Sequence, residues 1–269
     1  MRKLLFTAIA ISLAATTSNA GPLFWVQAKG QVRVDAATAT PDTGQVQALS
    51  ATAGPAGFDV ADANGVRSAH FNATASEGHL SGSADAFSHW INFLQTADSS
   101  TLLLQFFDTI TVNSAVLPAG TPVNITGTIV LTDTLSSLTA TCCSNAGGSG
   151  MGLATGDQAG PGQTISHTVV LQTPLIWFVG SANAFTGSMF FDAGSSSGVS
   201  PTQTGGSSVT ADMQFFLDPL DPNVTLSSAS GASYASPAAT VPSPEPGSLW
   251  LLLSGLILGA LGIRRNSLH

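Results

Sequence analysis

The sequence predicts an all-β protein, an antiparallel β-sandwich, and three observations support this fold class. Apolar residues recur at alternate positions in several stretches, which is the period of a half-buried strand. Turn-forming pairs such as Asn64-Gly65 separate these stretches, with no regular alternation of strands and helices. Charged residues make up only 8% of the chain, and abundant Ser and Thr favour strands over charged amphipathic helices. A jelly roll is one topology of such a sandwich.

Six stretches carry the strand pattern. In Phe24–Asp35 the even positions are apolar or small, and the odd positions are mostly polar. The same alternation is found in Leu102–Val112, where Asp108 interrupts it, and in Ile125–Leu135 and Ala211–Leu217. His167–Val179 is more continuously apolar and contains Pro174, which predicts two strands or an edge strand with a bulge. Ser188–Asp192 is short and apolar, as expected for a strand.

Other segments of the domain predict different structures. Ala84–Thr96 has apolar residues at mixed three- and four-residue spacing, which predicts a helix. The Gly/Ser-rich tracts Asn145–Gly152 and Gly194–Ser208 predict long flexible loops. Without an internal repeat of fixed period, residues 21–236 are predicted to form one β-sandwich domain.

The N-terminus predicts a signal peptide over residues 1–20, which signal peptidase would remove. Arg2 and Lys3 precede the apolar stretch Leu4–Ala15, and Ser18-Asn19-Ala20 supplies small residues for cleavage. A short N-terminal anchor is the alternative interpretation. Export would permit disulfides, but the adjacent Cys142 and Cys143 could close only a strained ring. A vicinal disulfide, two thiols and cross-links between chains all stay open.

The exported body is acidic. Between residues 21 and 244 the cations are Lys29, Arg33 and Arg67, against fourteen carboxylates, a net charge of −11. Nucleic acids and anionic membranes bind clustered cations, so this composition argues against both as partners.

The C-terminus predicts a membrane segment. Residues 237–247 form a Pro-rich stem, 248–263 a short transmembrane helix and 264–269 a basic cytoplasmic tail. Sixteen helical residues span roughly 24 Å, less than the hydrocarbon thickness of about 30 Å. Arg264 and Arg265 place the tail in the cytoplasm and the body outside. Gly255 and Gly259 match the GxxxG pattern of helix dimers.

Pro244, Glu245 and Pro246, followed by the apolar helix and the two arginines, resemble the PEP-CTERM sorting signal of Gram-negative bacteria. The common form has Val-Pro directly before Glu-Pro, whereas Ser243 and Pro244 are inserted here. The resemblance implies recognition of the triplet by an exosortase-like processing enzyme. It also implies transient residence in the inner membrane, then a place at the cell surface or outside the cell. Asp218–Tyr234 looks, more loosely, like the last strand of many such proteins. The class is linked to exopolysaccharide and biofilm.

Signals for catalysis or metal binding are weak, and we expect neither a metal nor a cofactor. His70, His79, His89 and His167 lack the tight spacing of zinc ligands. Gly194-Ser195-Ser196-Ser197-Gly198 matches Gly-x-Ser-x-Gly, but the following Gly-Val-Ser-Pro is a poor start for the required helix. Two acidic groups could bind calcium but read more simply as turns: Asp59, Asp62 and Asn64, and Asp218, Asp221 and Asn223. Glycosidase-type carboxylate pairs stay open, with Glu77 as the one glutamate of the body.

Four aromatic residues could contact a sugar. Trp177 lies within an apolar run, which favours a place in the core, while Trp90 and Tyr234 carry no further signal. Trp25 shares a strand face with polar residues, so it is the candidate glycan contact. We therefore expect a noncatalytic surface or extracellular-matrix protein. A carbohydrate-binding or adhesive module is the alternative, and a secreted hydrolase is a third hypothesis.

Overall fold

The computed structural model describes residues 23–34, 37–63, 65–90, 97–138, 144–196 and 203–237. Within these ranges the chain forms β-strands and no helix. The strands are β1 (Trp25–Val34), β2 (Ala37–Ala39), β3 (Ser50–Asp62), β4 (Gly65–Ser76), β5 (His79–Trp90), β6 (Ala97–Ser114), β7 (Pro122–Ser137), β8 (Ser144–Gly150), β9 (Leu153–Ala159), β10 (Thr164–Phe178), β11 (Ala182–Ser196), β12 (Gln203–Pro219) and β13 (Val224–Ser228).

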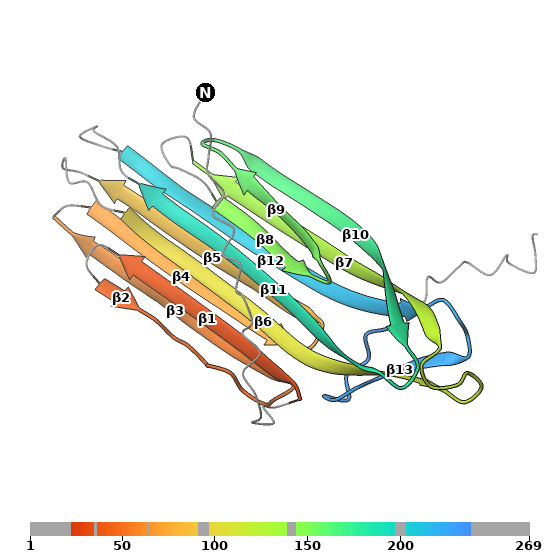
Figure 1. Cartoon of the computed structure of the whole chain (residues 1–269). Helices are drawn as coiled ribbons and strands as arrows, with labels where there is room; N and C mark the ends of the chain where they lie inside the picture. The colour runs from red at the N-terminus through yellow and green to blue at the C-terminus, as the bar shows by residue number, and fades with distance from the viewer. Residues whose placement is uncertain are drawn as a thin grey trace, which may run out of the picture. The chain divides into compact units, whose positions relative to one another are not determined.

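Two antiparallel sheets pack face to face with their strands running in nearly the same direction (Figure 1). Sheet A has the order β2-β1-β6-β11-β8-β9, and β13 pairs with the end of β6. Sheet B has the order β10-β7-β12-β5-β4-β3. One hydrophobic core fills the space between them. The predicted all-β sandwich is confirmed.

The alternating stretches turn their apolar faces into this core, as predicted. In β1 the buried positions include Val26, Ala28 and Val32, all fully inaccessible to solvent. The same parity holds in β6, β7 and β12, where the inward side chains include Phe106, Ile129 and Phe215. Removal of this apolar surface from water is the main favourable contribution to folding.

The prediction for 167–179 is confirmed in part. β10 lies at the edge of sheet B and pairs with β7 from Thr164 to Phe178 without a register shift. The predicted break or bulge at Pro174 is therefore wrong. An edge strand tolerates proline where the missing N–H would face away from the sheet.

The predicted helix over 84–96 is wrong for the part that is described. Residues up to Trp90 belong to β5, which is paired on one side with β4 and on the other with β12. The inward side chains Ala84, Ala86 and Ser88 are small and buried. Backbone pairing with two neighbours therefore overrides a weak helical spacing, as tertiary context often does.

The predicted flexible loops are largely strands. Ser144–Gly150 forms β8, and most of 194–208 belongs to the end of β11 and the start of β12. Glycine is needed in β8 because large side chains of the other sheet reach it: a Cβ at Gly148 would lie 2.5 Å from Met213 Cε. Glycine is also needed at position 187 of β11, because a Cβ there would lie 2.2 Å from Phe106 Cε1 of the neighbouring strand and 2.6 Å from Phe215 Cζ of the other sheet.

Candidate functional site

Trp25 lies at the start of β1 on the outer face of sheet A. It is paired with Phe107 of β6, and the two rings stack with centroids 6.2 Å apart and planes 9° apart. Their strand neighbours Val26 and Phe106 point into the core, so the stacked pair faces outward. The predicted glycan contact is therefore part of an aromatic pair rather than an isolated ring.

A second exposed ring lies farther across the same face. Phe190 of β11 is 51% exposed and has Leu103 and Gly147 as cross-strand neighbours. A Cβ at Gly147 would lie 3.1 Å from Phe190 Cε1, so the ring packs beside bare backbone on the β8 side. The sequence prediction missed Phe107 and Phe190, although a large apolar residue on the polar parity of a strand is a readable signal.

Polar groups form the next row beyond Phe190. Asp192 has Thr101 and Asn145 as cross-strand neighbours, with Gln31 and Gln158 on the two flanks. Asp192 Oδ1 is shielded from solvent and has no hydrogen-bond partner within the described ranges. Burial raises the pKa of the Asp192 carboxyl. An acceptor that is shielded from solvent and has no hydrogen-bond partner is rare in folded proteins.

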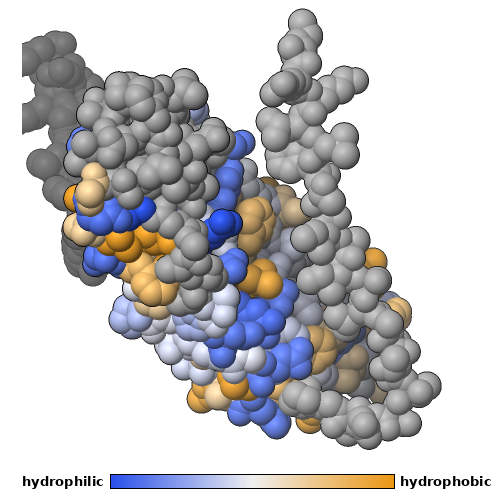
Figure 2. Space-filling view, turned by 90° about the vertical axis from the view of Figure 1, so that its left-hand side faces the viewer, coloured by the Kyte–Doolittle hydropathy of each residue, from blue (hydrophilic) through white to orange (hydrophobic). Residues whose placement is uncertain are grey.

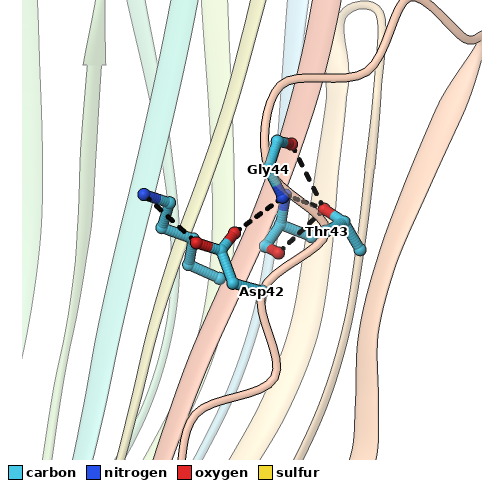
Figure 3. A network of polar contacts seen from close by, with 5 residues as sticks. Asp42, Thr43 and Gly44 are labelled. Atoms are coloured by element: carbon cyan, nitrogen blue, oxygen red, sulfur yellow. Dashed lines mark hydrogen bonds and ion pairs between the residues drawn. The ribbon is translucent and has the colours of Figure 1, made fainter.

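A shallow depression of about 310 Å³ lies beside this face. It is lined by Lys29 and Gln31 of β1, by Thr101 and Leu103 of β6, and by Thr40–Asp42. Its rim is held by an ion pair of 3.4 Å between Lys29 and Asp42, whose other oxygen accepts a hydrogen bond from the Gly44 N–H (Figure 3). Aromatic rings, amides and hydroxyls around a depression are groups that can contact sugar rings.

The four histidines do not converge. Each has its own partner: His70 contacts Asp59 and Asp85, His79 contacts Asp212, His89 contacts Thr204, and His167 contacts Asp157. Partial burial lowers the pKa of His70, but hydrogen bonds to Asp85 and Asp59 outweigh it and raise the pKa. The hydrogen bond to Asp212 raises the pKa of His79. Within the described ranges no three His, Cys, Asp or Glu side chains are arranged to hold a metal ion.

A pair of acids and a histidine meet at the margin of the sandwich, where the edge strands β9 and β10 lie. His167 is the cross-strand neighbour of Asp133, and its Nδ1 lies 2.9 Å from Asp157 Oδ2. Asp133 is 2% exposed, and burial, together with the nearby Asp157, raises its pKa to about 6. Both Asp133 oxygens are shielded from solvent, whereas the side chains of His167 and Asp157 are 51% and 23% exposed, so the accessible part of the cluster is a histidine–aspartate pair.

The Gly-x-Ser-x-Gly pattern does not form a nucleophile elbow in its described part. Gly194, Ser195 and Ser196 continue β11 and pair with β6, whereas the elbow requires a sharp turn into a helix. Ser195 is 3% exposed, and its hydroxyl donates a hydrogen bond of 3.2 Å to Asp98. Burial raises the pKa of Asp98 to about 6. Residues 197–198 lie outside the described ranges.

The acidic groups considered for calcium have other contacts. Asp59 contacts His70, and Asp62 forms an ion pair with Arg67. Asp221 accepts hydrogen bonds from the backbone and side-chain nitrogens of Asn223, which is the turn chemistry expected of aspartate. Asn64 lies outside the described ranges. Glu77 is partly buried, and burial raises the pKa of its carboxyl.

Asp108 and Tyr234 join the C-terminal part of the domain to β6. Asp108 is fully buried and accepts hydrogen bonds from Tyr234 Oη at 2.7 Å, from the Thr109 N–H at 2.7 Å, and from the hydroxyl and N–H of Ser230. Burial and Asp108 raise the pKa of Tyr234. Tyr234 is therefore a core residue and not a sugar platform, and Trp177 also packs against the core.

Several predicted site residues lie outside the described ranges. They are Cys142 and Cys143, the sorting triplet Pro244, Glu245 and Pro246, and Arg264 and Arg265. None of the described segments is a helix long and apolar enough to cross a membrane, and residues 248–263 are not among them.

Comparison with known proteins gives no match. No family model matches the chain, and no curated protein and no solved structure is significantly similar to it.

Proposed function

We propose that this chain is exported by its signal peptide and processed at its C-terminal sorting signal, to act as a noncatalytic protein of the cell surface or extracellular matrix. The observation that carries the proposal is where the fold closes. β13 pairs with β6, and Tyr234 then caps the buried Asp108, so the compact unit ends at Tyr234. Nine residues, 235–243, separate Tyr234 from the predicted processing triplet that begins at Pro244. Removal of the chain from Pro244 onward would leave β13 and Tyr234 in the body.

The surface supports a soluble role outside the cell. The body carries a net charge of −11. On the face shown in Figure 2, hydrophobic residues are scattered among hydrophilic ones and do not gather into one large patch. A high net charge and a mixed surface favour solubility. An association with exopolysaccharide or biofilm rests on the resemblance of the sorting signal.

The sorting proposal is tested in a host that carries the processing enzyme. Glu245→Ala should leave uncut, membrane-held protein, whereas Ser243→Ala, a change next to the triplet, should be processed normally. Fractionation followed by intact-mass analysis measures both outcomes and also locates the two cut sites. Release of Glu245→Ala at the wild-type level and mass would contradict the proposal.

A carbohydrate-binding or adhesive module is the second candidate function. It is supported by the outer face of sheet A, which presents the stacked Trp25–Phe107 pair and the exposed Phe190. Glycan-array binding should be lost in Trp25→Ala and in Phe190→Ala. The matched control is Phe87→Ala, which removes an exposed ring from the outer face of sheet B. Equal binding by all three variants would exclude this face as the site.

Two finer proposals complete the assignment. We propose no catalytic activity for the body, because the Asp133 oxygens are shielded from solvent and the described histidines each contact a separate partner. A secreted hydrolase stays the third hypothesis. A jelly-roll-like connection is proposed for β5 to β13, where the chain crosses repeatedly between the sheets.

A further inference from the structure

The free edge of β10 is the longest unprotected strand edge in the described part of the molecule. β10 runs for 15 residues and is hydrogen-bonded to β7 alone among the described strands. It follows the outer margin of sheet B in Figure 1. An exposed strand edge carries a row of backbone donors and acceptors that can pair with another chain.

The other sheet edges carry protection that β10 lacks. β2 has three residues, and an irregular segment beyond it covers β1, where the Thr43 hydroxyl both accepts from the Ala28 N–H and donates to the Ala28 carbonyl (Figure 3). β3 has a register shift between Ala53 and Ala56. β9 has only seven residues. Short strands, bulges and covering segments are the devices by which proteins block edge-to-edge pairing.

The backbone groups on the free edge can be assigned from the end of the strand. The Val179 N–H donates to the Thr121 carbonyl on the β7 side, whereas the N–H and carbonyl of Phe178 both bond to Ser181. Because these directions alternate along a strand, the even-numbered residues of β10 face away from β7. Pro174 is one of them, so its missing N–H leaves the intramolecular ladder intact. The free edge with full donor capacity is therefore 166–172.

The side chains that this edge presents on the outer face are uncharged, whereas His167 points to the other face and pairs with Asp157. The even side chains of 166–172 are Ser166, Thr168, Val170 and Gln172, and Val170 is 57% exposed. Their neighbours on the outer face of β7 are Thr134, Thr132, Val130 and Thr128. In a body with a net charge of −11, a strip without carboxylates is a surface where two copies can approach without direct repulsion.

We propose that 166–172 is a homodimerisation edge, on which β10 of a second copy adds as an antiparallel strand and joins the two B sheets. An antiparallel edge is self-complementary about a two-fold axis, so one segment serves both partners. The pairing consumes both free edges and closes the assembly at two copies. This inference does not depend on the sorting signal or on sugar binding.

The test is the molar mass of the full-length protein in mild detergent, measured by size-exclusion chromatography with light scattering across a concentration series. Wild type should be a dimer at high concentration. Val170→Lys places like charges close together across the new pairing and should raise the dissociation constant by about tenfold or more. Val130→Lys is the matched control, because Val130 is the direct neighbour of Val170 on the same face, one strand farther in. It should remain dimeric.

Circular dichroism and a thermal melt establish that both variants are folded. Concentration-dependent protection of the 166–172 amides from hydrogen exchange would further support the edge pairing. A wild-type protein that is still monomeric at about 100 µM would overturn the proposal. So would a dimer that persists in Val170→Lys and is lost in Gly259→Leu, since that result would assign association to the C-terminal segment.

Discussion

Tyr234→Phe tests whether the buried Asp108 holds the C-terminal part of the domain in place. The substitution removes one hydroxyl and leaves the ring that packs edge-on against Phe185 at 4.8 Å. A hydrogen bond to a charged group contributes about 1.5–3 kcal/mol. Asp108 is fully buried, so water cannot replace the lost donor. We expect the free energy of unfolding to fall by about 2 kcal/mol at pH 7.

Urea unfolding followed by tryptophan fluorescence measures this difference, and an unchanged m-value would confirm that the unfolded surface is the same. Ser230→Ala, which removes another donor to Asp108 Oδ2, should have a similar effect. The two losses should not be additive, because both act on one oxygen. A loss below about 0.5 kcal/mol for both variants would refute the reasoning, since exposed hydrogen bonds behave that way.

Three further predictions follow from buried groups. The pKa of Tyr234 in the folded state is raised above its unfolded value of about 10, so the contribution of this group to stability is complete below pH 10 and is lost as the pH rises above it. Because Tyr234 is the single tyrosine of the sequence, tyrosinate absorbance should appear only as the protein unfolds in alkali. The pKa of Asp133 is about 6 in the folded state against 3.8 for the free side chain, so the native state binds the proton more tightly and stability falls as the pH rises between these values. In urea unfolding, Asp133→Asn should have the same free energy of unfolding as wild type near pH 4 and a higher one, by about 1–3 kcal/mol, at pH 7. A difference that does not change with pH would contradict this prediction. Gly187→Ala should lower stability by about 1–3 kcal/mol by overpacking, whereas Gly160→Ala, which meets only a flexible Gln163 side chain, should change it by less than about 0.5 kcal/mol in the same assay.

The fold class could be predicted because apolar and polar residues alternate clearly in strands whose inward side chains are large. In β4 most of the apolar inward residues are alanines, at positions 69, 73 and 75, and Phe71 is the one large apolar residue among them. Alanine is small and common in both helices and strands, so the periodicity is easily overlooked. Strands such as β8 are harder still: their glycines are needed because Met213 and Phe215 of the facing sheet, and atoms of neighbouring strands in sheet A, lie close to where a Cβ would be. A single stretch of sequence does not show which strands lie beside it or opposite it.

In the candidate site, too, single residues could be predicted from their own strand, whereas their partners from other strands could not. Trp25 was predicted from its own strand, because a tryptophan on the polar parity of β1 is visible in the sequence. Its stacking partner Phe107 depends on the pairing of β1 with β6, strands about 80 residues apart, and pairing at this distance is not encoded locally. The inward acids Asp108 and Asp133 are visible as interruptions of an apolar face, but their partners Tyr234 and Asp157 come from other parts of the chain.

The position of Asp108 also constrains how the protein can be released. Cleavage anywhere before Tyr234 would remove a hydrogen-bond donor from the fully buried carboxylate of Asp108. The free energy cost of desolvating that oxygen would then no longer be offset by the hydrogen bond. Cleavage after Tyr234 leaves every described contact of Asp108 in place. A release step that preserves the fold must therefore cut beyond residue 234, and the predicted triplet at 244–246 satisfies this condition. Truncation before Ser230 should give a body that unfolds at lower urea concentration than one ending just before Pro244, and equal midpoints would show that the C-terminal clamp does not contribute to stability.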